Sequence, residues 1–248
     1  MYKGMNDTAV QLEIAMKDPL VKGILLYVNS PGGDVVASEI IHAKIKKIKE
    51  VGLPVYVSMG TVAASGGYYI SAPADKIFAN PSTITGSIGV VMSLTNYKEL
   101  GDKLGVHQIL VTSGSNKAMG NPLNEVTDEN LLIYQDIVNE SFNRFIEVVE
   151  DGRKIESATL RKFSDGRILS GKQAQELGLV DELGNLENTK QSLLNHLKIQ
   201  DVKVISYQKQ QSLFDFMNSN NQIAISQQVK EIKAEITDTQ TKLMYLHQ

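Results

Sequence analysis

The chain has 248 residues, a formal net charge of −3 at pH 7 and no cysteine. The nearly balanced charge argues against a nucleic-acid-binding surface, and the lack of cysteine excludes a disulfide framework, a thiolate nucleophile and a cysteine zinc site. No apolar run reaches the roughly 18–20 residues that span a bilayer, and MYKGMNDTAV lacks the apolar centre of a signal peptide, so we expect a soluble chain. Its length allows one large domain or two small ones.

The first third of the chain alternates between helix-like and strand-like segments. We expect a helix over 7–18, a buried strand in KGILLYVNSPGG at 22–33 that ends in a glycine turn, and then a helix from Asp34 to about Gly52. The apolar residues of that helix follow helical spacing: Val36, Ile40, Ile41, Ile45 and Ile48. Further along, we expect a strand over 53–60, a short helix over 65–72 and a strand over 76–80.

The same alternation continues with a loop at 81–89, a helix near 96–104 and a strand over 107–113. A long helix follows a possible cap at Thr127 or Asp128, and its apolar face recurs every three or four residues: Leu131, Tyr134, Val138, Phe142, Phe145 and Val149. Residues 165–184 are typical of a turn, a helix and a turn, and residues 202–207 of a last strand. This order predicts an α/β domain with a mainly parallel sheet over 1–208, and a tail or interaction arm over 209–248.

Three glycine-bearing loops each follow an expected strand: NSPGGD at 29–34, GTVAASGG at 60–67 and TSGSNKAMG at 112–120. Ligands of open α/β sheets bind at the carboxyl ends of strands, so these loops can converge on one site. The small neighbours of Ser65 leave room for a substrate carbonyl, and a helix start behind it would aim the Gly66 N–H group at a developing oxyanion. Close packing of a helix start against a sheet requires the same composition, so both interpretations stay open.

The first loop offers a second set of backbone donors. Pro31 stiffens the turn, Gly32 and Gly33 free the backbone, and a helix that begins at Asp34 leaves N–H groups without helical partners. Donors of this kind suit an oxyanion hole, although an ordinary strand-to-helix turn has the same residues.

A serine nucleophile also needs a base. Among His42, His107, His196 and His247, His107 has the most suitable position, yet no spacing identifies a carboxylate that would orient it. The Gly-x-Ser-x-Gly elbow of α/β-hydrolases is not met, because Ala63 occupies the first glycine position. Lys117, in a glycine- and serine-rich loop after a strand, is the other candidate, since a lysine acts as a base where burial keeps its amine neutral.

Taken together, the loops resemble those of the signal peptide peptidase A (SppA) family, serine peptidases of the ClpP/crotonase superfamily. The resemblance is carried by KGILLYVNSPGG, by PVYVSMGTVAASGGYYISAPADKIFANPSTITGSIGV, by the lysine of TSGSNK and by DGRILSGKQAQELGLVDELG. It covers most of residues 20–185 and implies a ClpP/crotonase-like α/β spiral with a mainly parallel sheet core and packed helices.

By position, Ser65 resembles the nucleophile of this family and Lys117 its general base. Ser87, in TGSIGV, matches the serine that holds the lysine amine, and Gly33 and Gly66 match the oxyanion hole. The implied activity is that of a serine endopeptidase with a Ser–Lys dyad, which hydrolyses peptide bonds by acyl transfer and requires no metal or cofactor.

The resemblance also implies partners and a location. Family members assemble into homo-oligomeric rings or domes, and in single-domain members neighbouring subunits supply the nucleophile and the lysine. An N-terminal membrane anchor and an early strand normally precede the matching region, and this chain begins after both. We therefore expect, from the resemblance alone, membrane association, an extracytoplasmic catalytic domain and cleaved signal peptides as substrates. A missing first strand would leave one edge of the sheet open.

Three alternatives remain at this stage. The first is a ClpP-like peptidase with a Ser–His–Asp triad that uses His107. The second is a crotonase-type enzyme that acts on acyl-CoA thioesters through the same two amides without a nucleophile. The third is a catalytically inactive oligomeric scaffold that only binds partners. Two interpretations stay open for LMYLHQ, the apolar end of the polar C-terminal arm: it binds an apolar cleft, or it is a frayed terminus.

Overall fold

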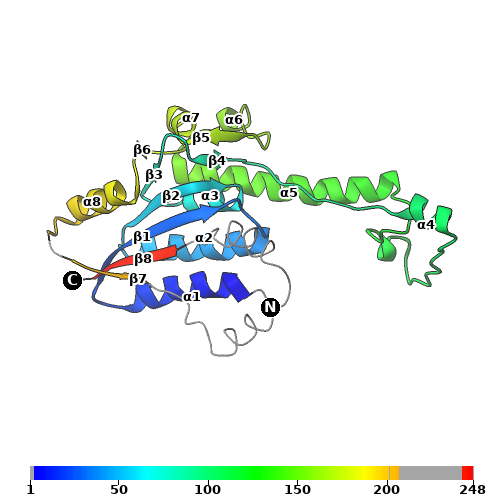
Figure 1. The fold of residues 1–248 in the computed structure, drawn as a ribbon, viewed down its shortest axis with the longest axis horizontal. Coiled ribbons are helices and arrows are strands. Elements are labelled where there is room, and N and C mark those ends of the chain that lie inside the picture. The colour runs from blue at the N-terminus through cyan, green and yellow to red at the C-terminus, as the bar shows by residue number, and fades with distance from the viewer. Residues whose placement is uncertain (1–2, 201, 207–241, 248) are drawn as a thin grey trace, which may run out of the picture. The chain divides into compact units, whose positions relative to one another are not determined.

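The computed structural model describes residues 3–200, 202–206 and 242–247, and it divides into two compact units. Unit 1 comprises residues 1–88 and 145–248, and unit 2 comprises residues 89–144. Figure 1 shows the elements of both units along the chain. Most of the predicted arm at 209–248 lies outside the described residues.

Unit 1 is built on one sheet, and its strands are β1 (Val21–Ser30), β2 (Val55–Ala64), β3 (Lys76–Ala79), β4 (Ile84–Gly86), β5 (Ile168–Ser170), β6 (Glu182–Leu183), β7 (Lys203–Ser206) and β8 (Lys242–His247). The strand order is β5-β4-β2-β1-β8-β7, and β3 joins β2 to β6. The pairs around β2 are parallel, as is β3 with β6, whereas β4–β5, β1–β8 and β7–β8 are antiparallel. The predicted α/β fold with a mainly parallel core is therefore confirmed.

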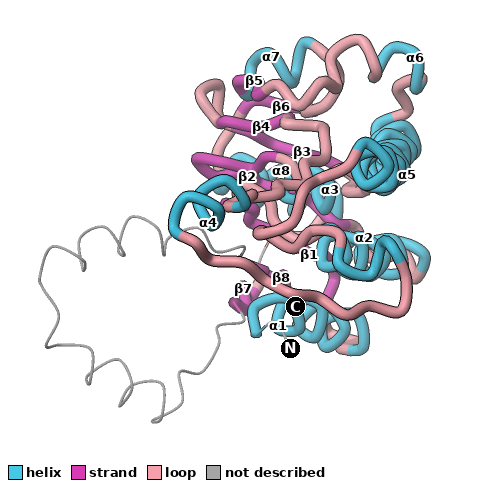
Figure 2. Tube along the Cα trace, turned by 90° about the vertical axis from the view of Figure 1, so that its right-hand side faces the viewer, coloured by secondary structure: helices cyan, strands magenta, loops and turns pink. Residues whose placement is uncertain are grey.

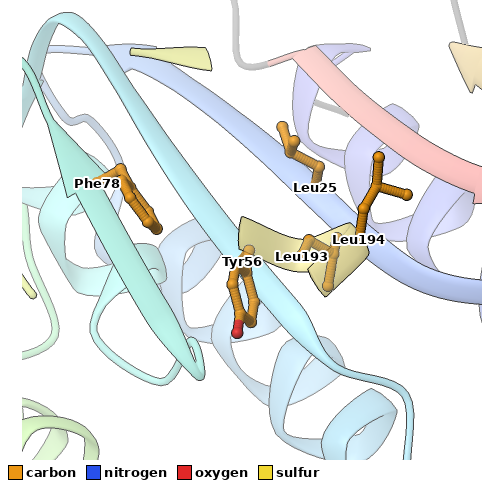
Figure 3. Close-up of a cluster of buried hydrophobic side chains, with 5 residues drawn as sticks. All are labelled: Leu25, Tyr56, Phe78, Leu193 and Leu194. Atoms are coloured by element: carbon orange, nitrogen blue, oxygen red, sulfur yellow. The ribbon is translucent and has the colours of Figure 1, made fainter. Parts of the chain in front are cut away.

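The helices of unit 1 are α1 (Lys3–Lys17), α2 (Val35–Glu50), α3 (Gly66–Ser71), α6 (Ser157–Leu160), α7 (Gly171–Glu176) and α8 (Leu186–Leu197). Helix α8 covers one face of the sheet with Leu193 and Leu194, which pack on Leu25, Tyr56 and Phe78 (Figure 3). Because side chains of a strand alternate between its faces, the next residues along β1 and β2 point to the other face, where α1 and α2 lie (Figure 2). Both faces of the central strands are thus buried, as parallel sheets require.

Unit 2 contains α4 (Lys98–Leu104), the 3₁₀ turn η1 (Ser115–Ala118) and most of α5 (Asp128–Arg153), whose last residues belong to unit 1. The prediction of a strand over 107–113 is wrong for the single chain, because these residues pair with no strand among the described residues. Ile109 and Val111 are 91% and 98% exposed. A strand sequence without a partner strand has no backbone groups to pair with.

Other differences from the sequence prediction concern unit 1. Strand β2 runs on to Ala64, through most of the segment predicted as a glycine loop, and β4 lies inside the predicted loop at 81–89. Helix α8 was not expected from the sequence. At the far end of the chain, residues 242–247 form β8, which pairs with β1 from Val21 to Tyr27. Among the described residues, none of the helices combines the length and the apolar character needed to cross a bilayer.

Candidate active site

Ser65 lies between the end of β2 and the start of α3, with a φ of 51° and a ψ of −119°. Residues other than glycine seldom adopt a positive φ, and such strained positions cluster at functional sites. In α/β-hydrolases a strained strand-to-helix turn presents the nucleophilic serine in the same way. The sequence lacks the first glycine of that elbow motif, but the backbone at Ser65 forms an equivalent turn.

The elements on both sides of Ser65 are firmly anchored. Ala63 and Ala64 are buried at the end of β2, and Tyr68 is fully buried in α3. The Tyr68 hydroxyl donates a hydrogen bond to the carbonyl oxygen of Leu179 at 2.9 Å. Burial raises the pKa of this hydroxyl above its usual range, so it stays protonated and keeps donating. The start of α3 is therefore fixed relative to the sheet.

The loop from Ser30 to Asp34 lies directly against this turn. Gly32 has a φ of +111°, and a β-carbon built on it would lie 2.8 Å from both the amide nitrogen of Gly66 and the β-carbon of Ser65. A β-carbon built on Gly66 would lie 3.3 Å from the amide nitrogen of Gly33. No side chain fits in these spaces, so glycine is required for the two loops to approach each other.

Two backbone N–H groups, those of Gly33 and Gly66, thus lie close together beside the Ser65 side chain. The Gly66 N–H belongs to the first turn of α3, and the Gly33 N–H precedes α2, whose cap is Asp34: its carboxylate accepts a hydrogen bond from the Ala37 amide at 2.9 Å. Amides at such positions have no partner within their own helix, and they can stabilise negative charge on an oxygen placed between them.

Ser87 follows β4 at the same edge of the sheet. The register pairs Ala64 with Gly86, and the Ser65 amide donates to the Gly86 carbonyl oxygen at 2.9 Å. Ser87 also has a positive φ, 49°, and its own amide donates to the carbonyl oxygen of Arg167 at 2.8 Å. The carboxyl ends of two neighbouring parallel strands therefore carry Ser65 and Ser87, and the structure brings both together with Gly33 and Gly66.

Lys117 belongs to unit 2, where it lies in η1 and is exposed. The histidine considered as an alternative base, His107, is in the same unit. Its Nδ1 lies 3.8 Å from Oδ1 of Asp102, and its side chain is 71% exposed. Four of the five predicted site residues therefore share unit 1, and the predicted base is carried by the other unit.

Sequence reasoning missed the polar side chains that support the end of β2. Thr85 is fully buried, and its hydroxyl donates to the carbonyl oxygen of Ala63 at 2.6 Å. Thr83 and Asn29 also bind the backbone of β2. Thr83 and Thr85 alternate in TIT, a strand-like pattern within a segment that the sequence analysis assigned to a loop.

The fold of the chain is similar to that of ClpP, as the predicted ClpP/crotonase-like fold requires. A mutant of ClpP1 from Listeria monocytogenes is structurally similar, with a TM-score of 0.50 at 21% sequence identity, over 73% of this chain and 84% of that one. The sequence profile of Peptidase family S49 matches residues 47–200, which is more than half of the chain. The chain therefore belongs to peptidase family S49, as the resemblance to the SppA family predicted.

Several relatives agree with this assignment. An Enterococcus faecium protein assigned as a signal peptide peptidase SppA is 42% identical over 89% of this chain, which spans 64% of that protein. A Methanocaldococcus jannaschii protein assigned as a protease is 38% identical over 77% of this chain, which spans 61% of it. Protease 4 of Haemophilus influenzae is 38% identical over 81% of this chain, which spans 34% of it. The chain thus spans less than two thirds of the length of these relatives.

Proposed function

We propose that the protein is a serine endopeptidase in which Ser65 is the nucleophile and Lys117 the general base. The observation that carries the proposal is the geometry at Ser65: a serine in a strained strand-to-helix turn, flanked by the N–H groups of Gly33 and Gly66. A serine that only served packing would have no need of this backbone conformation, because a glycine would adopt it at lower cost.

The proposed reaction is acyl transfer through a covalent ester on Ser65. The neutral amine of Lys117 accepts the proton of the Ser65 hydroxyl, and the oxygen attacks the peptide carbonyl carbon. The negative charge that develops on the carbonyl oxygen is stabilised by the amides of Gly33 and Gly66, each worth about 3–4 kcal/mol in the transition state. The ammonium then protonates the leaving amine, and a water molecule, deprotonated by the same lysine, hydrolyses the ester.

A lysine that acts as a base needs surroundings that exclude water and keep its amine neutral. In the part of the chain that the structure describes, Lys117 is exposed on unit 2. We therefore propose that another surface covers Lys117 and excludes water, and that the Ser87 hydroxyl accepts a hydrogen bond from its amine there. In a homo-oligomeric ring or dome, a neighbouring subunit would supply this surface.

The substrates that we propose are peptides, with signal peptides cleaved at the membrane as the natural class. This part of the proposal is supported by the name of the Enterococcus faecium relative and by the family assignment. An N-terminal anchor like that of the family would hold the catalytic domain at the extracytoplasmic face of the membrane. The proposed chemistry requires no metal and no cofactor.

A fluorophosphonate probe, which phosphonylates activated serines, tests the proposal together with turnover of a fluorogenic peptide. We expect labelling at Ser65 in the wild type, and loss of both labelling and turnover in Ser65→Ala and Lys117→Ala. The matched control is His107→Ala, which we expect to behave as the wild type. Loss of activity in His107→Ala with retention in Lys117→Ala would replace the dyad by a Ser–His–Asp triad. An unlabelled Ser65 in an assembled sample would point to an inactive scaffold.

A further inference from the structure

Strand β2, which ends directly before Ser65, changes its partner halfway along its length. Its residues 56–58 pair with β3, and its residues 62–64 pair with β4. On its other edge, β1 pairs Val28 with Met59 and then Ser30 with Ala63, so that two steps along β1 correspond to four along β2. Residues 60–62 therefore form a bulge opposite the single residue Asn29. Bulges bend a strand and change the direction of the side chains beyond them.

Two side chains hold this bulge from opposite sides. The Asn29 side chain accepts a hydrogen bond from the Val62 amide through Oδ1 at 3.1 Å. It also packs on Gly60, where a β-carbon would lie 2.8 Å from the same oxygen. Thr83, at 2% exposed, donates from its hydroxyl to the Gly60 carbonyl oxygen at 2.7 Å. These side chains bind backbone groups at the place where the regular ladder between strands is interrupted.

Asn29 also lies directly before the loop that carries Gly33. The next residue, Ser30, accepts a hydrogen bond on its hydroxyl from the Gly32 amide at 3.2 Å, which fixes the start of that loop. Asn29 thus connects two parts of the candidate site. Its backbone leads into the loop that contains Gly33, and its side chain binds the strand that ends directly before Ser65.

We propose that Asn29 is a positioning residue that sets the distance between the Ser65 hydroxyl and the two oxyanion-hole amides. The inference rests on the proposed function, because it assumes that Ser65 attacks a carbonyl whose oxygen binds Gly33 and Gly66. Without the Asn29 side chain the bulge loses one of its two supports, and the end of β2 shifts relative to the loop. A misplacement of about 1 Å at a reacting atom costs about 100-fold in rate.

The test compares Asn29→Ala, Asn29→Asp and Asn185→Ala in peptide turnover and in fluorophosphonate labelling of Ser65. Asn185 is the matched control, because it caps α8 through two backbone amides and its loss also destabilises the fold. We expect Asn29→Ala to lower kcat about 100-fold at nearly unchanged KM. Asn29→Asp, which keeps an acceptor oxygen, should recover most of the loss, whereas Asn185→Ala should lower the melting temperature at unchanged kcat.

The inference is overturned if folded Asn29→Ala keeps kcat within about threefold of the wild type, or if Asn29→Asp is as impaired as Asn29→Ala. Thr83→Val provides a second variant with the same expected kcat effect, should Asn29→Ala fail to fold. A crystal structure of Asn29→Ala gives a readout that does not depend on activity: we expect residues 60–65 to shift relative to Gly33, and an unchanged position would refute the positioning role. If instead Ser65→Ala retains wild-type turnover, the proposed function fails. The crystal structure of Asn29→Ala then still shows whether Asn29 holds residues 60–65 in place.

Discussion

Ser65 adopts a backbone conformation that costs on the order of 1–3 kcal/mol for a residue with a side chain. Its neighbours enforce the conformation: the Ser65 amide donates to the Gly86 carbonyl oxygen, and the Ser65 carbonyl oxygen accepts from the Tyr69 amide, both at 2.9 Å. Because β2 and α3 are buried on both sides, the strain cannot relax by a shift of one element. The strained conformation of Ser65, which the proposed chemistry requires, therefore lowers the stability of the fold.

Because of this strain, we expect glycine to be more stabilising than alanine at position 65, the reverse of the usual order. We expect Ser65→Gly to have a free energy of unfolding about 1 kcal/mol higher than Ser65→Ala, because glycine adopts a positive φ without strain. Urea denaturation measures the difference. The matched control is Ser141, within helix α5, where Ser141→Gly should instead be less stable than Ser141→Ala by about 1 kcal/mol. Equal stabilities of the two Ser65 variants would show that the turn carries no strain.

At the scale of residues, the sequence predicted the parts of the site that depend on local composition. Small residues and unpaired helix amides made Ser65 and the two glycine loops candidates but left close packing open, and the resemblance to the SppA family selected Ser65, Gly33 and Gly66. In the structure these three residues lie together. Asn29 binds a bulge residue 33 positions away along the chain, and Thr83 binds one 23 positions away. No local sequence pattern reveals such a pairing.

Among the helices, α1 and α2 are joined by an ion pair at Glu13. Its carboxylate accepts hydrogen bonds from Nζ of Lys17, within α1, at 2.8 Å, and from Nζ of Lys44, in α2, at 2.6 Å. Hydrogen bonding to Lys17 and then to Lys44 lowers the pKa of Glu13 from 4.5 to about 2. The folded state therefore favours the ionised carboxylate more than the unfolded chain does.

This shift predicts how stability depends on pH. Because the pKa is lower in the folded state, the contribution of Glu13 is fully present above pH 4.5 and is lost as the pH falls to about 2. The free energy of unfolding of the wild type should exceed that of Glu13→Gln at pH 6, and the difference should shrink steadily on acidification. Chemical denaturation at several pH values measures it. Glu13 and Lys44 are partly exposed and Lys17 is exposed, so 1 M salt should reduce the difference. A difference independent of pH would contradict the assignment.

Helices and strands were predicted well where a periodic apolar pattern coincides with a buried face. They were predicted poorly where a strand depends on pairing with a distant segment. The long helix α5 and the buried strands β1 and β3 fit their patterns. In α2, however, Val36 and Ile40 are 61% and 48% exposed although they match the helical spacing. The buried face of this helix lies one position further along and is formed by Ala37, Ser38, Ile41, Ile45 and Ile48. A short strand such as β4 is stabilised by its hydrogen bonds to the neighbouring strands β2 and β5. Its three residues are too few to specify a strand by themselves.

Unit 2 exposes many of its large hydrophobic side chains. All of its residues are described, and the exposed side chains lie in its first half and in the first part of α5: Val91, Met92, Leu94, Tyr97, Leu100, Leu104, Val106, Ile109, Leu110, Val111, Leu131, Leu132 and Ile137. Contiguous apolar exposure of this kind marks interaction sites. Lys117, the proposed base, lies in the same unit. A partner that covers these side chains would also exclude water from Lys117, as the proposed mechanism requires.

Mixing two inactive variants tests whether a second copy of the chain is that partner. In a ring where each site takes Ser65 from one subunit and Lys117 from its neighbour, an equal mixture of Ser65→Ala and Lys117→Ala should recover about one quarter of the wild-type activity, the product of two probabilities of one half. Co-expression followed by assay of the assembled fraction measures the recovery. Replacing Lys117→Ala in the mixture by the double variant should give no activity. If no ratio of the single variants restores turnover, both residues act within one chain, and the apolar side chains of unit 2 then have another role.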